Sequence, residues 1–412
     1  MSSTASETIS TVEEDRALVT RIYAPPSPGL RSQLQRAREH VASGRTLLSE
    51  IARLAVGPGR LKPQEYFYYR LFEQNLTVEQ KREFIGKREQ PWIHLACNER
   101  SWTGVCHDKL LFYTLMAGLG FPTPRLLALY HDSRKGVPAA QHLRSREDLR
   151  RFFETVEVPL FAKPVDGVHS VGSIAIERIE AARGMAVLAS GVEVPLERVL
   201  DRMEQSKSSG YLIQERVRPH PDLVRLSGPT LSCARIMVLM GRQGPELSRT
   251  QFKIPVGRNT ADNFWRGNMI AAVNPETGAI ERVVKGSGFD QTFPTAHPDT
   301  GQPLIGAVLP HWADLTRLAL DAAPALERIG IQAWDIAIGA SGPVLIECNS
   351  GGDFSPPQLA WGRGMLDERF RRFLREQGYR GPRPAILIPL AMARAAARKV
   401  GLARQRRTSR HL

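Results

Sequence analysis

The stretch that decides the fold runs from residue 334 to residue 354 and reads WDIAIGASGPVLIECNSGGDF. Two apolar runs, residues 334–338 and 344–346, flank a Gly-Ala-Ser-Gly-Pro sequence that favours a tight turn. Short apolar runs joined by such a turn predict a β-hairpin. The rest of the chain is organised around this pair of strands.

Three oxygen-bearing side chains lie on the predicted hairpin. Pairing across the turn would bring Asp335 beside Glu347, and strand alternation would place Glu347 and Asn349 on one face. Two carboxylates and an amide, without a partner base, are ligands that Mg²⁺ prefers when it also takes oxygens from a nucleotide phosphate. The hairpin therefore predicts a metal site, and an exposed hairpin with unrelated acids is the alternative.

Composition sets the broad class of the protein. The chain has 412 residues, of which 42% are hydrophobic and 24% charged, as is typical of a soluble globular protein with two or three lobes. No apolar run approaches the roughly 18 to 20 residues of a membrane span, and the start lacks a secretory signal, so we expect a cytoplasmic protein. The four cysteines show no paired spacing, which indicates reduced thiols.

The formal net charge of +14 is concentrated at one end of the chain. Residues 391–412 carry seven basic side chains and no acids, so half of the excess lies in a basic C-terminal tail, residues 386–412. The tail has no interleaved aromatic residues for base stacking, which disfavours a nucleic-acid partner. A solvated tail and peripheral contact with an anionic membrane surface or an acidic partner are the open alternatives.

The N-terminal quarter carries no predicted site. Residues 1–20 are polar and are predicted to be disordered. Residues 21–107 form a predicted helical region, because apolar positions recur at helical spacing over 29–55 and again over 62–87. Its aromatic cluster at positions 66–69 and 72 is interpreted as core, since aromatic stripes at helical spacing more often pack than bind.

Two lysines stand at the ends of predicted elements. Asp108 can begin a helix over 108–117, which would place Lys109 in its first turn, and an extended segment over 125–130 follows. Lys163 ends an apolar strand and precedes a glycine-containing loop, residues 166–173. Free backbone N–H groups beside a lysine can cradle a polyphosphate. A surface lysine and a plain hairpin turn are the alternatives, and no P-loop or Rossmann motif is present.

Two further strands carry polar residues. Residues 211–217 read YLIQERV and are followed by Asp222, an arrangement in which backbone groups could bind an adenine edge and Asp222 a ribose. Residues 230–240 form a buried type of strand with a single charge, Arg235. An arginine in such a run is either ion-paired within the fold or directed into a site, and a phosphate-rich site favours the second.

The order of these motifs resembles the ATP-grasp superfamily, which includes D-alanine–D-alanine ligase and alpha-L-glutamate ligase-like proteins. The resemblance covers residues 108–353, and the pattern Asp335…Glu347-x-Asn349 is its most specific part. The chain is most similar to sugar-transfer-associated ATP-grasp proteins. The stretches that carry this likeness are DNFWRGNMIAAVNPETGAI at 262–280, HPDTG at 297–301 and PHW at 310–312.

The resemblance implies an α+β fold of the ATP-grasp type. A pre-lid helix and strand would span residues 108–140, the lid 141–216 and the larger C-terminal domain 217–385. ATP and Mg²⁺ would lie between the lid and the C-terminal domain, with the metal on Asp335, Glu347 and Asn349. The implied nucleotide-binding residues are Lys109, Lys163, Asp166, Gly167, Ser170, Gly172, Ser173, Gln214, Glu215, Arg216, Val217 and Asp222.

One departure from the resemblance bears on catalysis. D-alanine–D-alanine ligase carries an arginine two residues before its first metal-binding aspartate, whereas this chain has Ala333. Arg235 is a candidate to supply that charge, and Lys253 and Arg266 are candidates to hold an anionic substrate. Catalysis therefore requires that at least one of these cations faces the cleft.

The resemblance implies a ligase that joins a small-molecule carboxylate to an amine through an acyl phosphate. Such a reaction depends on positioning and charge neutralisation, which agrees with the lack of a Ser/His/Asp or Cys/His signature in the sequence. The implied setting is modification of a polysaccharide, a peptide or a secondary metabolite. A kinase-like phosphotransferase and a nucleotide-binding scaffold of glycan assembly on the same fold are the alternatives.

Overall fold

The computed structural model describes most of the chain between residues 29 and 382. The described ranges are 29–38, 44–73, 75–132, 140–157, 159–166, 172–205, 210–257, 259, 262, 264 and 267–382. The predictions for residues 1–20, for the basic tail 386–412, and for Gly167, Ser170 and Arg266 lie outside these ranges. None of the helices within them is long and apolar enough to cross a bilayer.

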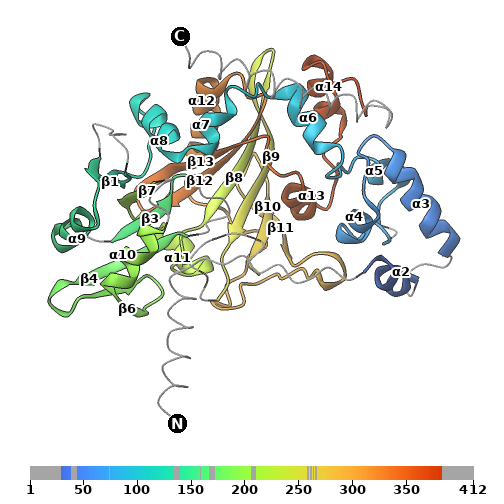
Figure 1. Ribbon diagram of the computed structural model, residues 1–412. Coiled ribbons are helices and arrows are strands. Elements are labelled where there is room, and N and C mark those ends of the chain that lie inside the picture. Colours follow the sequence, from blue (N-terminus) through green and yellow to red (C-terminus); the bar gives the residue numbers. More distant parts are fainter. Residues whose placement is uncertain are drawn as a thin grey trace, which may run out of the picture.

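Two sheets and the helices around them give the α+β architecture that the sequence predicts (Figure 1). In the described part of the chain, the lid sheet has the strand order β2-β1-β7-β3-β4-β5-β6, and the core sheet has the order β11-β10-β9-β8-β12-β13. The lid strands are β1 Leu126–Tyr130, β2 Gln141–Leu143, β3 Leu160–Pro164, β4 Ile174–Glu180, β5 Met185–Leu188, β6 Glu193–Pro195 and β7 Tyr211–Glu215. The core strands are β8 Cys233–Gly241, β9 Gly244–Ile254, β10 Met269–Val273, β11 Ile280–Lys285, β12 Ile331–Gly339 and β13 Gly342–Ser350.

The predicted hairpin is confirmed at one edge of the core sheet. β12 and β13 pair antiparallel with Asp335 opposite Glu347 and Ala333 opposite Asn349. Both strands are longer than the apolar runs that identified them. Every residue of β12 is buried because the strand pairs on both sides, with β8 and β13, and because helix α12 (Trp312–Ala322) contacts it. Burial on both faces explains why β12 reads as a continuous apolar run rather than an alternating one.

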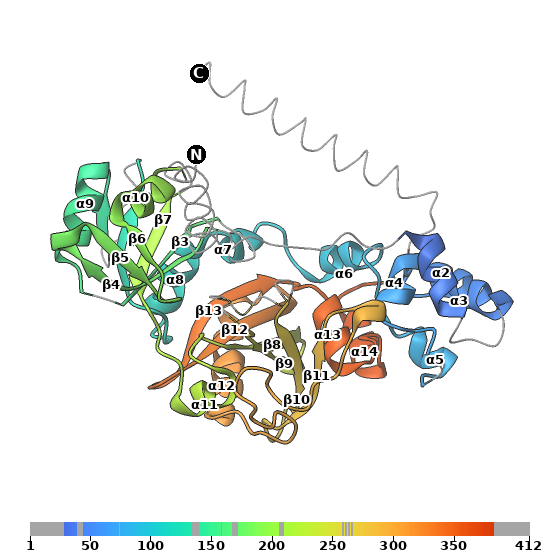
Figure 2. The same ribbon diagram turned by 90° about the horizontal axis from the view of Figure 1, so that it is seen from below.

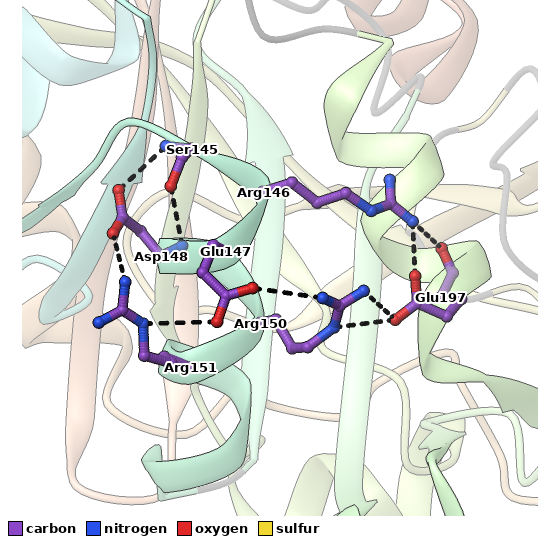
Figure 3. Close-up of polar contacts among 7 residues, drawn as sticks. All are labelled: Ser145, Arg146, Glu147, Asp148, Arg150, Arg151 and Glu197. Atoms are coloured by element: carbon purple, nitrogen blue, oxygen red, sulfur yellow. Dashed lines mark hydrogen bonds and ion pairs between the residues drawn. The ribbon is translucent and has the colours of Figure 1, made fainter.

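The lid is a separate layer with its own core. Helices α9 (Arg146–Thr155) and α10 (Leu196–Glu204) bury their apolar faces with the lid strands. Figure 3 shows how their outer faces are joined, because Arg146 and Arg150 both reach Glu197, at 2.7 and 2.8 Å. Ser145 caps α9 through a capping box with Asp148. β1, expected before the lid, pairs with β7 inside the lid sheet.

The N-terminal region is mostly helical, as predicted. Its described helices between residues 30 and 81 lie on the opposite side of the core sheet from the lid (Figure 2), whereas the helix at residues 103–107 contacts β13 on the lid side. Its helices are α2 Leu30–Arg38, α3 Gly44–Val56, α4 Pro63–Tyr68, α5 Val78–Lys81, α6 Gln90–Cys97 and α7 Thr103–His107. Tyr66, Phe67 and Phe72 are buried in one cluster with Ile270 of β10 and Val284 of β11. The aromatic stripe is therefore core, as interpreted from its spacing.

All three sequence stretches that carry the family likeness contribute contacts that support the core sheet. The turn before β11 places Gly278 at a positive φ of 75° against the ring of Trp312, where an added Cβ would lie 2.4 Å from a ring carbon. The Trp312 indole N–H donates to the Pro275 carbonyl at 3.0 Å. The buried His297 ring contacts the Pro255 carbonyl at 2.8 Å and so fixes the end of β9. Gly278, Trp312 and His297 are not among the residues that line the cavity described below, and we interpret them as positioning the sheet.

Candidate functional site

A cavity of about 930 Å³ lies between the lid and the core sheet. Its lining comes from β3 and β7 of the lid, from the helices α6 and α8 (Lys109–Gly118), and from β8, β9, β12 and β13 of the core sheet. Most of the residues predicted for a site meet here. Those that line the cavity are Lys109, Lys163, Asp166, Ser173, Gln214, Arg216, Val217, Arg235, Lys253, Asp335, Glu347 and Asn349.

The centre of the cavity floor is a row of charged side chains on three neighbouring strands. Register places Glu347 of β13, Asp335 of β12 and Arg235 of β8 side by side. Arg235 donates two hydrogen bonds to Asp335, from Nε to Oδ1 at 2.6 Å and from a terminal nitrogen to Oδ2 at 2.7 Å. Its other contact, with Glu347, is at 4.0 Å. The arginine of the β8 run is thus both ion-paired and directed into the cavity.

Lys253 of β9 adds a second cation to the same carboxylate. Its Nζ lies 2.8 Å from Asp335 Oδ2 and 3.5 Å from Asp262. Asp262 begins the 262–280 stretch, but the sequence predicted no role for it in a site. Burial disfavours the charge of the Asp335 carboxylate, but Arg235 and Lys253 outweigh it and hold the pKa of Asp335 well below its ordinary value. Burial likewise opposes the charge on Arg235, and Asp335 outweighs it and raises the pKa of Arg235.

The three residues predicted to bind a metal differ in their surroundings. Glu347 is about one-third exposed, at 33%, and accepts a hydrogen bond from Asn349 at 3.3 Å, so this pair offers oxygens to the cavity. Asp335 is 2% exposed, and both of its oxygens already accept from Arg235 or Lys253. The described residues contain no group of three or more His, Cys, Asp or Glu that could hold a metal. Glu347 and Asn349 therefore have oxygens available for a hard cation, whereas both oxygens of Asp335 are engaged by Arg235 and Lys253.

The roof of the cavity presents two lysines, of which Lys163 is buried and Lys109 is partly buried. Lys163 at the end of β3 donates to the Tyr113 hydroxyl at 2.7 Å, and that hydroxyl donates to the Ile346 carbonyl of β13 at 2.8 Å. Burial, reinforced by the charge of Lys109, lowers the pKa of Lys163 to about 8. Burial also lowers the pKa of Lys109. Two ammonium groups that are held out of water and close to each other form a strong site for an anion.

Lys109 owes its position to the start of α8. The Asp108 carboxylate accepts from the N–H groups of Leu110 and Leu111 and caps the helix, as the sequence predicts. The backbone N–H of Lys109 donates to the Val165 carbonyl just after β3, which ties the helix to the lid. Lys109 and Lys163 therefore come together through one helix start and one strand end.

The other predicted nucleotide-binding residues differ in whether they face the cavity. Gln214 is buried and faces the cavity, with its Oε1 lacking a partner among the described residues. Glu215, the next residue on β7, points to the outer face and pairs with Arg125 at 3.1 Å. Asp222 lies in the first turn of α11 (Pro221–Ser227), pairs with Arg225 at 2.5 Å, and is not among the lining residues. Gly172 adopts a positive φ of 80° beside the cavity residue Ser173.

Several lining residues were not found from the sequence. Gln90 and His94 enter the cavity from α6, in the helical region to which no site was assigned. Gln251 and Phe264 line it from β9 and from the following loop. Asp262 accepts from the Cys233 backbone N–H at 2.9 Å and approaches Lys253. The only sequence signal for any of them was the 262–280 stretch, because the others lie in runs with ordinary helix or strand periodicity.

Solved structures offer likenesses of fold at low sequence identity. The ADP complex of purK, an N5-carboxyaminoimidazole ribonucleotide synthetase, has 12% identity and a TM-score of 0.38 over 66% of this chain and 53% of its own. The D-alanine-D-alanine ligase from Coxiella burnetii has 12% identity and a TM-score of 0.37, covering 68% of this chain and 61% of its own. VanG D-Ala:D-Ser ligase from Enterococcus faecalis has 12% identity and a TM-score of 0.38, covering 68% and 64%. This chain thus spans between about half and two-thirds of the length of these structures.

The comparison with curated proteins gives no match. A family model described as sugar-transfer associated ATP-grasp matches residues 91–372, more than half of the chain. The match includes the lysine pair, the β12/β13 hairpin and the sequence stretches on which the resemblance was based. The chain belongs to the sugar-transfer associated ATP-grasp family.

Proposed function

We propose that this protein is an ATP- and Mg²⁺-dependent ligase that joins a carboxylate to an amine. The observation that carries the proposal is the meeting of Lys109 and Lys163 with the Arg235–Asp335–Glu347 row across one cavity. A polyphosphate needs cations on one side and a metal with carboxylate ligands on the other, and this cavity has Lys109 and Lys163 on one side and the carboxylates of Asp335 and Glu347 on the other. A reaction through a phosphorylated substrate needs no covalent nucleophile on the protein, only positioning and charge neutralisation.

The nucleotide would occupy the β13 end of the cavity. Lys109 and Lys163 would neutralise its phosphates, and Asp166, Gly172 and Ser173 would lie over them with Gly167 and Ser170. Gln214, Arg216 and the backbone of Glu215 and Val217 would hold the adenine, and Asp222 would reach the ribose after a change from its pairing with Arg225. Bound Mg²⁺ would supply positive charge to the phosphates, with Asp335, Glu347 and Asn349 as its protein ligands.

Arg235 and Lys253 would bind the phosphate group that is transferred or the carboxylate of the substrate. In the absence of other anions both hold Asp335, at 2.6 to 2.8 Å. A phosphate group or a substrate carboxylate would compete with Asp335 for these cations and so release a metal ligand. Arg266 is proposed as a third cation of the same region. These side chains bind and orient the reactants, since an arginine at its ordinary pKa cannot exchange protons near neutral pH.

The proposed reaction has two balanced steps. An oxygen of the substrate carboxylate attacks the γ-phosphorus of ATP. The bond between the γ-phosphorus and the oxygen that bridges it to the β-phosphate breaks, which releases ADP and forms an acyl phosphate. The amine nitrogen then attacks the acyl carbon, loses a proton, and displaces phosphate to leave an amide. The substrates are proposed to be small molecules of polysaccharide, peptide or secondary-metabolite modification, and the need for ATP agrees with a cytoplasmic setting.

Thermal shift and product analysis on one sample test the proposal. ATP with Mg²⁺ should raise the melting temperature, because a ligand that binds only the folded state stabilises it by mass action. The sample is then supplied with pairs of carboxylates and amines, and ADP, phosphate and amide are measured. Equal amounts of the three support the ligase. A stable phosphorylated product identifies a phosphotransferase. Stabilisation without turnover of any pair leaves a scaffold, or a ligase for substrates outside the supplied pairs, and no stabilisation rejects the nucleotide site.

A further inference from the structure

Gln251 is a buried polar residue that the proposed chemistry leaves without a role. It lies on β9 directly opposite Arg235 of β8, is 0% exposed, and lines the cavity. Its amide nitrogen and its amide oxygen are both shielded from solvent, and neither has a hydrogen-bond partner within the described part of the chain. A buried amide that makes no hydrogen bond is costly, and native folds rarely leave one unless it meets a ligand or ordered water.

Two other glutamines with the same burial show that this fold satisfies glutamine amides where they are structural. Gln332 is 0% exposed, donates to the carbonyls of residues 323, 326 and 329 at 2.9 to 3.0 Å, and accepts from the Trp334 indole at 2.9 Å. Gln358 is 0% exposed, donates to the Tyr69 hydroxyl and the Ile85 carbonyl, and accepts from the Ile85 N–H at 2.7 Å. Gln251 differs from both because it faces the cavity.

The position of Gln251 separates it from the proposed nucleotide end. The lysines and the metal ligands cluster over β13 and β12, whereas β9 is two strands beyond β12 in the order β13-β12-β8-β9-β10. Neighbouring strands lie about 4.8 Å apart, so Gln251 is about 10 Å from the Asp335 strand. This far end of the cavity is closed by α6 and by α13 (Ser355–Trp361), which packs on β9 and β10.

The walls of this far end are apolar and uncharged over much of their surface. Ile270, Phe264 and Pro356 contribute apolar surface. His94 contributes a buried Nε2 without a partner in the described residues, and burial lowers the pKa of His94 to about 4, so the ring is neutral near pH 7. Asp353 also lines the cavity, but Lys87 neutralises it by an ion pair. The charged neighbours of Gln251 are Arg235, opposite it on β8, and Lys253, two residues along β9, and both are paired with Asp335. Around Gln251 the described part of the wall therefore offers hydrogen bonds and no free counter-charge.

We propose that Gln251 determines substrate specificity by binding a neutral group that both donates and accepts hydrogen bonds, such as a carboxamide or a pair of adjacent hydroxyls. The group belongs to the substrate whose reacting carboxylate meets Arg235 and Lys253, so this inference rests on the proposed function. A primary amide or a vicinal diol can engage the Oε1 and Nε2 of one glutamine together. An ammonium in the same place would lose its hydration beside Arg235 and Lys253, and a carboxylate would have to draw these cations away from Asp335.

The first test compares the stability of three variants and needs no ligand. Gln332→Met and Gln358→Met remove satisfied amides and should lower the melting temperature by several degrees, because their former partners stay buried and unpaired. Gln251→Met removes an amide that has no protein partner, so its melting temperature should equal or exceed that of the parent protein. A fall as large as that of Gln358→Met would show that Gln251 serves the fold, and would overturn the inference.

The second test measures ligand chemistry by saturation-transfer NMR with propanamide, 1,2-propanediol, propionate and propylammonium as probes. Propanamide or propanediol should receive saturation from the full-length protein, and their affinity should fall about tenfold in Gln251→Met, the loss expected for about two hydrogen bonds. A response to propanamide alone points to an amide substrate, and a response to the diol alone to a hydroxylated one. Binding of only the charged probes, or equal binding to both proteins, overturns the inference.

The ATP-induced rise in melting temperature is recorded on the same samples. A rise with ATP and Mg²⁺ but no effect of Gln251→Met on any neutral probe rejects the specificity assignment alone. No rise with ATP rejects the proposed ligase, whatever the probes show.

Discussion

Asp335 and Glu347 are opposite each other on one hairpin, but they differ in exposure and in their ion pairs with the rest of the fold. Asp335 is 2% exposed and neutralises two buried cations, Arg235 and Lys253. Glu347 is 33% exposed and has one distant cation at 4.0 Å. Loss of charge at Asp335 leaves Arg235 with only Glu347 at 4.0 Å and Lys253 with only Asp262 at 3.5 Å, while loss of charge at Glu347 leaves the close contacts of Arg235 in place.

The two carboxylates are therefore predicted to separate stability from activity. Glu347→Gln should change the free energy of unfolding by less than about 0.5 kcal/mol, as for most partly exposed substitutions, and abolish metal-dependent ATP turnover. Asp335→Asn should abolish turnover and also destabilise the protein by about 3–5 kcal/mol, because Arg235 and Lys253 stay buried. Urea unfolding and phosphate release measure both quantities. Turnover retained by Glu347→Gln would remove it from the metal site.

Lys163 provides a prediction for pH. Its folded pKa of about 8 lies below the ordinary value of 10.5 because burial disfavours the ammonium. Phosphate binding favours the ammonium, so affinity for ATP should fall as pH rises through about 8, by up to about tenfold per pH unit until the pKa of the bound state is reached. Isothermal titration of ATP from pH 7 to 9.5 measures this, with uptake of about one proton on binding above pH 8.

The same shift has the opposite effect on stability. Below pH 8 Lys163 is protonated in both the folded and the unfolded protein, and its burial is a constant penalty. Between about 8 and 10.5 the unfolded protein binds more protons, so the contribution of this group to stability rises with pH. Lys163→Arg keeps its charge over the whole range and serves as the control, since its ATP affinity should lose the pH dependence. An unchanged pH profile in this variant would assign the effect to another group.

At the scale of the element, helix α8 carries two residues of the candidate site, Lys109 and Tyr113. Lys109 and Tyr113 are four residues apart and so lie on one face of the helix. Tyr113 connects Lys163 of β3 to the Ile346 carbonyl of β13. The helix therefore links the lid to the metal hairpin, and its first turn sets the position of Lys109.

Removal of the α8 cap tests this link. Asp108→Ala deletes the acceptor of the Leu110 and Leu111 N–H groups and should lower stability by about 1 kcal/mol, the usual worth of an N-cap. Fraying of the first turn should also weaken ATP binding through Lys109. Asp108→Asn keeps a capping oxygen without the charge and should retain most of the stability. Loss of ATP affinity in Asp108→Asn equal to that in Asp108→Ala would show that the charge of Asp108, rather than the cap, matters.

Strand alternation explains which neighbours of predicted site residues face elsewhere. Gln214 and Glu215 are consecutive on β7, so their side chains must lie on opposite faces of the lid sheet, and only Gln214 faces the cavity. A nucleotide role for Glu215 through its backbone stays a prediction. The same alternation places Cys348 on the far side of β13 from Glu347 and Asn349, where it is 1% exposed in the main core.

At the scale of the molecule, the N-terminal region completes the core sheet. Its helices cover Ile270, Ala272 and Val284, and α6 closes the far end of the cavity. The family match begins at residue 91, so most of this cover lies outside it. The region is therefore part of one folded unit with the core sheet rather than an appended domain.

Deletion of residues 1–90 should consequently destabilise the remaining protein by several kcal/mol, at about 1.5–3 kcal/mol for each large apolar side chain that becomes exposed. Size-exclusion chromatography and thermal melting of the truncated protein measure this. Deletion of residues 392–412 is the matched control, because a basic appendage should leave melting temperature and ATP affinity unchanged. A soluble 91–412 fragment with the same melting temperature as the full chain would show that the N-terminal helices form a separate unit.

The sequence by itself determined the local pieces of this protein. Apolar runs around a turn predicted the β12/β13 hairpin and the pairing of Asp335 with Glu347, and a capping aspartate before an apolar helix predicted the position of Lys109. Only the tertiary structure decided that Arg235, 100 residues from Asp335 in the chain, neutralises it, and that Gln251 and α6 line the same cavity. The physical reason is that residue periodicity encodes which face of an element is buried, whereas the register between distant strands decides which faces meet.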